Sequence, residues 1–252
     1  MIFNFLQLPA ILFVGWGSGI LVNIAADFWM INNELVNSDC VHCSVRSISV
    51  WKYYLWPIKC AECGKIKPPR IWLVELIYMI LTLFLWYTQS QNLNFLPSLI
   101  LLIYFGVIWI IDIEHRIIPN VLIILGSILG LIFGISLNEI MPTIIGGFTG
   151  LIFMFIIYAF GHLFVRLINR LRETQLNEPA MGFGDVLFGG VVGLMVGFPD
   201  IIFSLTLTVI AAGLFAMIYM IVLLIIHRYK MGIAFPYAPF MILGTVYYLY
   251  IV

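Results

Sequence analysis

Charge is what this sequence has least of. Only 10% of its 252 residues are charged, whereas 63% are hydrophobic, and soluble chains carry about 25% charged residues. No soluble core hides that much apolar surface, so we expect the lipid bilayer to surround most of the chain. The formal net charge is zero, which gives no electrostatic reason to expect nucleic acid as a partner.

Two familiar sequence signals are also missing. Residues 1–30 are apolar, but they have neither a basic start nor a small-residue cleavage site. We therefore interpret them as a retained membrane helix and not as a removed signal peptide. The chain has no G-x-G-x-x-G pattern, so nothing in the residues themselves predicts a nucleotide-type cofactor.

Long apolar runs are abundant. A spanning helix needs roughly 20 apolar residues, and eight stretches qualify as candidates. They are residues 5–30, 71–89, 95–113, 117–137, 141–164, 182–198, 200–226 and 235–252. The expected fold class is an all-α polytopic membrane protein with about eight transmembrane helices. We divide it into a first helix (1–30), a loop (31–70) and a seven-helix membrane domain (71–252).

The basic residues predict the orientation. With eight spans, all twelve lysines and arginines fall in loops on the same side of the membrane. The positive-inside rule makes that side cytoplasmic and places both termini outside. The loop at 31–70 is then cytoplasmic.

Two carboxylates stand at the ends of apolar stretches. Asp112 closes the third stretch, and Asp185 follows Gly182-Phe183-Gly184 and opens the sixth. Both are expected at the cytoplasmic boundary, at similar depth. Ionisable residues at membrane depth are costly and usually functional, and two carboxylates that share a site can act as acid and base. Gly182 and Gly184 permit close backbone approach. The alternative is two unrelated interfacial acids.

Cysteine is scarce and confined to one loop. The four residues form two C-x2-C pairs, Cys40 with Cys43 and Cys60 with Cys63. Such spacing in a reducing compartment is typical of a zinc knuckle. Four thiolates leave no open coordination position, so we expect a structural zinc. Two alternatives remain open: His42 replaces one ligand, or the thiols bind no metal.

These motifs together resemble a known family, the bacterial type IV prepilin peptidases of the GxGD aspartic protease class. Asp112-Ile113 followed by Ile118-Pro119-Asn120 resembles the first aspartate motif, and Gly182-Phe183-Gly184-Asp185 matches the second. The paired cysteine loop, the stretch from Lys67 to Leu76 and the segment from Phe235 to Phe240 resemble further family features. The chain departs from the family at Leu187, where a lysine is usual, and around Gly17-Ser18, Asn23 and Asp27.

The resemblance implies a bifunctional enzyme in the bacterial plasma (inner) membrane. As peptidase it would cleave a prepilin or pseudopilin precursor, with a basic leader and an apolar helix, for type IV pilus assembly or type II secretion. As S-adenosylmethionine-dependent methyltransferase it would then N-methylate the new N-terminus. Glu75 either extends to the interface or lines the methylation site.

Two other classes of function stay open at this point. Membrane carboxylates also couple ions or protons in transporters, although their position at one face and the lack of a repeat favour this less. The chain is alternatively a non-catalytic assembly factor of a pilus or secretion system, whose cysteine loop docks a partner.

Overall fold

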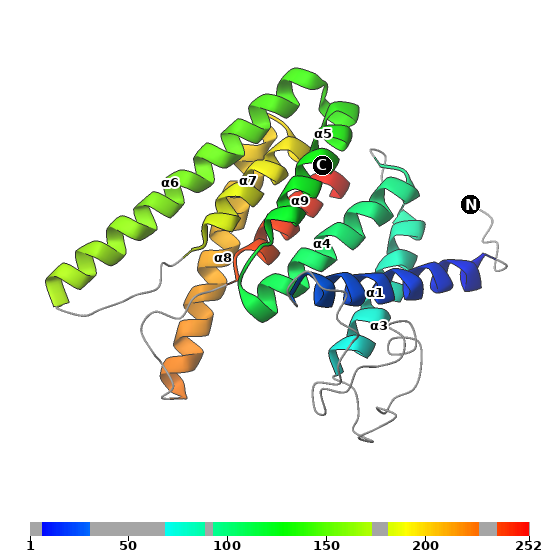
Figure 1. Cartoon of the computed structure of the whole chain (residues 1–252), viewed down its shortest axis with the longest axis horizontal. Coiled ribbons are helices and arrows are strands. Elements are labelled where there is room, and N and C mark those ends of the chain that lie inside the picture. The colour runs from blue at the N-terminus through cyan, green and yellow to red at the C-terminus, as the bar shows by residue number, and fades with distance from the viewer. Residues whose placement is uncertain (1–6, 31–68, 89–92, 173–180, 227–235, 252) are drawn as a thin grey trace. The chain divides into compact units, whose positions relative to one another are not determined.

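The chain folds into helices, as its composition predicts (Figure 1). The computed structural model describes residues 7–30, 69–88, 93–172, 181–226 and 236–251. Within these ranges lie eight α-helices and no strand. They are α1 (Leu8–Met30), α3 (Pro69–Thr88), α4 (Phe95–His115), α5 (Asn120–Asn138), α6 (Ile140–Arg172), α7 (Phe183–Val196), α8 (Asp200–Ile225) and α9 (Ala238–Ile251). The all-α prediction is confirmed.

The observed helix lengths differ from those predicted from the apolar runs. Six of those described are long and apolar enough to cross a membrane. α7 and α9 have 14 residues each, about 21 Å at 1.5 Å per residue, which is less than the roughly 30 Å hydrocarbon core. α6 continues to Arg172, well past its predicted end at 164.

Prolines begin several of these helices. Pro69 is the first residue of α3, and Pro119 and Pro199 are the N-caps of α5 and α8. Proline has no backbone N–H, and the first N–H groups of a helix have no partner within it, so proline costs little at these positions.

The chain divides into two compact units, here called the N-terminal unit (Met1–Val107) and the C-terminal unit (Ile108–Val252). In the N-terminal unit, α1 packs closely on α3. A Cβ added to Gly15 or Gly19 would lie 2.8 Å from the Cα of Met79 or Glu75, respectively. The Tyr78 hydroxyl donates to the Leu102 carbonyl at 2.8 Å, which ties α3 to the first part of α4.

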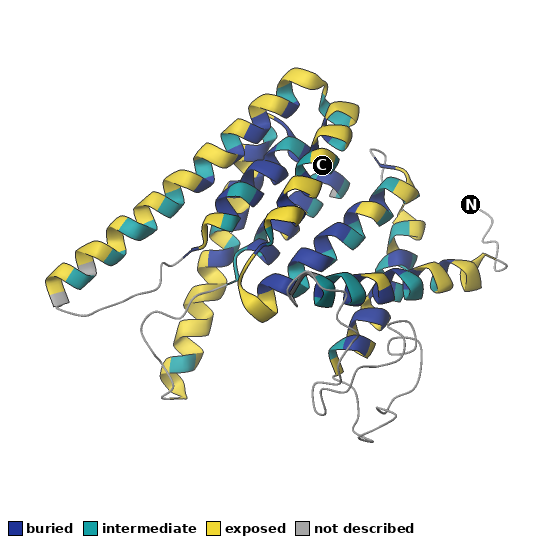
Figure 2. Cartoon of the chain, in the orientation of Figure 1, coloured by how far each residue is buried: buried dark blue, intermediate teal, exposed yellow. Residues whose placement is uncertain are grey.

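The C-terminal unit is built around α7. Most of its side chains are buried (Figure 2), because α6 approaches it through glycines. A Cβ added to Gly193 would lie 2.2 Å from the Gly146 carbonyl oxygen. At the end of α7, the Asn138 amide donates to the carbonyls of Met195 at 3.3 Å and Val196 at 3.0 Å. It thereby satisfies acceptors that a helix terminus leaves open.

This glycine contact generates a test of the packing. We predict that Gly193→Ala lowers the free energy of unfolding by about 1–3 kcal/mol, because the added methyl forces two backbones apart. The measurement is the apparent Tm of the purified protein in detergent. Gly213→Ala in α8 is the control, because no atom lies within 4 Å of its added Cβ. A Tm that falls equally in both variants would contradict the packing described.

Candidate active site

Asp112 lies in the last turn of α4 and is almost fully buried, with 3% of its surface exposed. Its Oδ2 accepts a hydrogen bond from the Ala238 backbone N–H at 3.0 Å. Ala238 is the first residue of α9. The start of a helix carries unpaired N–H groups and partial positive charge, both of which stabilise a carboxylate. The C-terminal helix of the chain therefore holds the first aspartate.

Asp185 lies in the first turn of α7 and is also buried, with 8% exposed. Its Oδ2 accepts from the Gly182 N–H at 3.2 Å, in the back-reaching geometry of a helix N-terminus. Its Oδ1 is buried and accepts no hydrogen bond from the part of the chain that the structure describes. That oxygen is available to a water molecule or to a substrate group.

The turn between α4 and α5 brings the two aspartate motifs together. A Cβ added to Gly184 would lie 3.4 Å from the Ile118 Cβ and 3.6 Å from its backbone nitrogen. These are ordinary van der Waals distances, so Gly184 lies directly beside this turn. In this arrangement the Asp185 carboxylate lies within electrostatic range of Asp112. The structure thus places Asp112, Gly182, Gly184 and Asp185 at one end of the C-terminal unit.

The segment before α9 supplies residues to which sequence reasoning gave no role. Ala238 binds Asp112, and the half-buried Tyr237 lies within electrostatic range of Asp185. The Tyr237 carbonyl accepts from the N–H groups of Phe240 and Met241, so the segment is fixed as the cap of α9. In the sequence, the only sign of a role for this segment was that Phe235 to Phe240, which contains two prolines, resembles a family motif.

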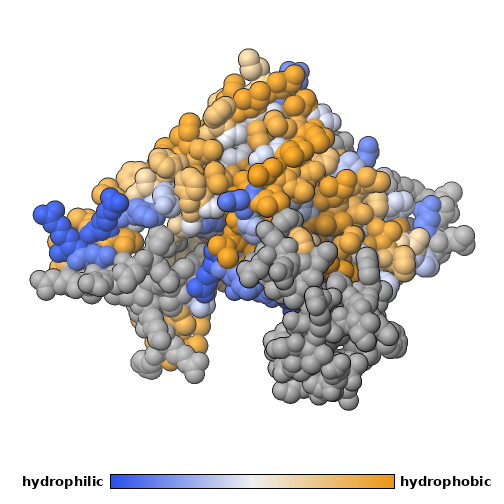
Figure 3. Space-filling view, viewed as in Figure 1, coloured by the Kyte–Doolittle hydropathy of each residue, from blue (hydrophilic) through white to orange (hydrophobic). Residues whose placement is uncertain are grey.

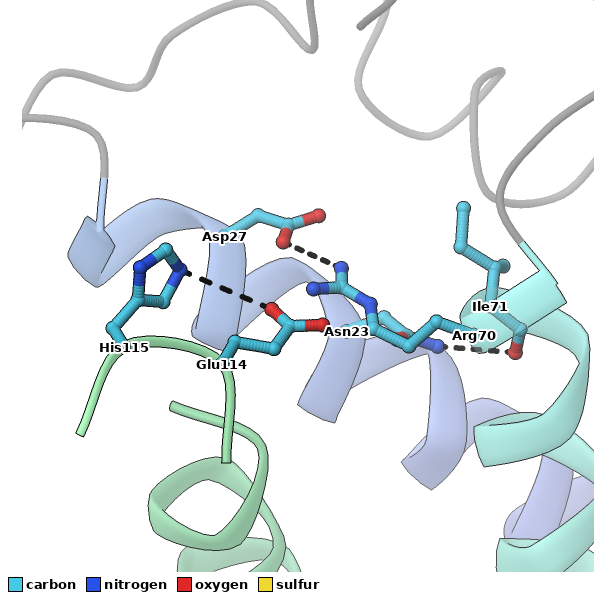
Figure 4. A network of polar contacts seen from close by, with 6 residues as sticks. All are labelled: Asn23, Asp27, Arg70, Ile71, Glu114 and His115. Atoms are coloured by element: carbon cyan, nitrogen blue, oxygen red, sulfur yellow. Dashed lines mark hydrogen bonds and ion pairs between the residues drawn. The ribbon is translucent and has the colours of Figure 1, made fainter. Parts of the chain in front are cut away.

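Glu75 lies in the N-terminal unit, buried between α1 and α3 with 3% exposed. Its Oε2 accepts from the Trp16 indole N–H at 3.0 Å. One helical turn away, the Asn23 amide donates to the Ile71 carbonyl at 3.3 Å (Figure 4). The carboxylate is therefore covered by α1 and does not extend outward.

An ion pair completes this face of the N-terminal unit. Arg70, at the start of α3, binds Asp27 of α1 (Figure 4). Asp27 occupies one of the positions where the sequence departs from the family. The departure thus supplies a partner for a basic residue.

The predicted zinc ligands Cys40, Cys43, Cys60 and Cys63 lie outside the described residues, as does His42. The zinc site stays a prediction.

The buried pair Asp112 and Asp185 has the composition of an acid–base site. Two carboxylates come from different helices, each is oriented by a backbone N–H, and one oxygen is left for a reactant. Such a pair can hold one proton and exchange it with a bound water.

The comparisons with known proteins bear on the same region. Residues 99–221 match the model of the type IV leader peptidase family. No curated protein and no solved structure matches the chain. The matched segment contains α5, α6 and α7 and both aspartates. The resemblance to the prepilin peptidases is therefore confirmed over residues 99–221, the segment that holds the candidate active site.

Proposed function

We propose that this protein is an intramembrane aspartic endopeptidase that removes the leader of type IV prepilin-like precursors at the cytoplasmic membrane face. One observation carries the proposal. Inside the segment that matches a peptidase family, Asp112 and Asp185 are both buried in one compact unit, and each carboxylate accepts a backbone N–H from the start of a helix.

The chemistry follows from one shared proton. With one carboxylate ionised and the other protonated, the ionised group takes a proton from a water whose oxygen attacks the scissile carbonyl carbon. The protonated group donates its proton to the carbonyl oxygen. The resulting tetrahedral species collapses when the carboxyl group that took the water proton passes it to the amide nitrogen. The C–N bond then breaks, and a hydroxyl group of the tetrahedral species returns its proton to the other carboxylate. The free Oδ1 of Asp185 is the site where we place the attacking water or the carbonyl group.

The surroundings of Asp112 fit a substrate that is half leader and half membrane helix. The next residues, Ile113 to Ile117, are exposed, and they include Glu114, His115 and Arg116. Polar residues one turn beyond the dyad place it near the end of the apolar zone. A cut there separates a basic leader in water from an apolar helix in lipid, and the acidic pair attracts the leader. By resemblance, the bond cut follows a glycine.

A second activity is part of the proposal. By resemblance, the protein binds S-adenosylmethionine and methylates the new N-terminal amine, and Glu75 is our candidate for binding at that site. Its burial against Trp16 supports a role inside the helix pair. The aspartates belong to the C-terminal unit and Glu75 to the N-terminal unit, which favours separate groups for the two reactions. We further propose that a structural zinc in the cysteine loop shapes the N-terminal unit.

The dyad generates the first functional prediction. Asp112→Asn and Asp185→Asn should each lower the rate of precursor cleavage by at least about 10³-fold, because neither remaining carboxylate can serve as both acid and base. The assay is cleavage of a prepilin peptide in detergent, which also separates a peptidase from a transporter or an assembly factor. Glu114→Gln removes an exposed acid two residues from Asp112 and should retain cleavage. Normal processing by either aspartate variant would end the dyad assignment.

The hydrogen bond from the Ala238 N–H to Asp112 generates a second functional prediction. Proline fits the first position of a helix but has no N–H to donate. Ala238→Pro should therefore lower kcat about 10- to 100-fold, since a hydrogen bond to a charged group is worth about 1.5–3 kcal/mol. Ala238→Ser adds volume, keeps the N–H and should stay near the parent rate. Equal losses in the two variants would show that crowding, and not the missing donor, is responsible.

The proposal that cleavage and methylation use separate groups can be tested directly. Asp185→Asn, given a pre-cleaved pilin, should still methylate it, and Glu75→Gln, given the full precursor, should still cleave it. The reason is that the two carboxylates lie in different units. Both products can be followed by mass spectrometry of the pilin N-terminus. If the aspartate variant fails to methylate pre-cleaved pilin, the two reactions share one site.

A further inference from the structure

α6 is longer than a membrane crossing requires, and the excess lies in its last third. The helix has 33 residues, about 50 Å at 1.5 Å per residue, against a hydrocarbon core of about 30 Å. Described contacts with α7 run from Gly146 to Tyr158, whose ring lies 5.9 Å from that of Phe183. From there to Arg172, α6 continues for about 21 Å.

This last third is amphipathic. Five large apolar side chains that recur with the period of a helix are more than half exposed and form one face. They are Phe160, Leu163, Phe164, Leu167 and Leu171, exposed by 67%, 61%, 62%, 54% and 74%. The exposed Arg166 and Arg170 project about 100° round the helix from the centre of that face. Figure 3 shows hydrophilic side chains gathered at the C-terminal end of α6, beside apolar surface.

The charge and the hydropathy of the last third of α6 together favour one kind of partner. α6 contains no acidic residue, so its arginines repel a basic leader and attract anions. Five exposed apolar side chains are disfavoured in water. The headgroup layer of an anionic membrane satisfies both faces, with apolar side chains at the acyl boundary and arginines at the phosphates.

The length of the helix agrees with that placement. Residues 140–165, before the first arginine, span about 39 Å. They match a core of about 30 Å when the helix is tilted by about 40°, at the upper end of the usual range. A helix so tilted carries its last two turns into the headgroup layer at about 50° to the membrane plane.

We propose that α6 enters the headgroup layer on the active-site side of the membrane at Arg166, where Arg166 and Arg170 bind the phosphates of anionic phospholipids and the apolar face from Phe160 to Leu171 lies along the acyl boundary. This contact also sets the depth of the active site. Tyr158, which touches Phe183 next to the Gly184–Asp185 pair, is eight residues before Arg166. With the tilt above, Phe183 lies about 9 Å below the phosphates.

Trypsin offers a direct test, because it cleaves after arginine. The full protein is placed in nanodiscs of phosphatidylcholine alone or with one third phosphatidylglycerol. Cleavage after Arg166 and Arg170 is followed by mass spectrometry, relative to cleavage after the exposed Arg116 in the same digest. We expect the anionic lipid to slow the α6 cuts about tenfold or more relative to that reference. An equal relative rate in both nanodiscs would overturn the proposal.

Variants test the apolar face separately. Phe164→Ser with Leu167→Ser keeps both cleavage sites and should be cut rapidly in either lipid. Phe148→Ser changes a similarly exposed residue in the other half of α6, and this variant should still be protected from trypsin by the anionic lipid. If Phe148→Ser also loses the protection, the contact is not local to the end of α6. Inorganic phosphate added to phosphatidylcholine nanodiscs should not protect. If it protects as well as the anionic lipid, the arginines bind free anions, and the lipid assignment is wrong.

Discussion

A carboxylate removed from water costs several kcal/mol unless hydrogen bonds and nearby charges offset the loss. This protein buries two, Asp112 and Asp185, in a chain with very few charged residues. Each receives a backbone N–H from the start of a helix, one from α9 and one from the residue before α7. The requirement to supply those donors explains why helix ends, and not helix middles, meet at the site.

The same requirement accounts for the two short helices. α7 and α9 start at the aspartates, inside the C-terminal unit, so neither needs the length of a membrane crossing. α7 is nevertheless central, because glycines of α6 let the two backbones touch along it. Asn138 fixes the far end of α7. The position of Asp185 is therefore set by packing along the whole helix as well as by its own hydrogen bond.

Sequence reasoning predicted the helices well, because long apolar runs and prolines are local signals. It also identified the two aspartate motifs that the structure brings into one unit. It missed the bond between Ala238 and Asp112, which joins residues 126 positions apart and leaves no pattern in either segment. It ended α6 too early because the uncharged apolar run stops before Arg166, whereas the helix itself continues to Arg172 as an amphipathic segment. Residues 31–68 are not described, so the zinc prediction rests on cysteine spacing.

The central claim is that Asp112 and Asp185 form one site that stabilises a tetrahedral intermediate. The most direct measurement uses a prepilin peptide in which a hydroxyethylene group replaces the scissile amide. Its affinity for the protein is compared with the affinity of a matched peptide that lacks this group and is not cut. A transition-state mimic binds about 10² times more tightly than substrate, or better, when the site is complementary to the intermediate. The account predicts such a preference in the parent protein and its loss in both Asp112→Asn and Asp185→Asn. Equal affinity for the two peptides, or an unchanged preference in either variant, would contradict it.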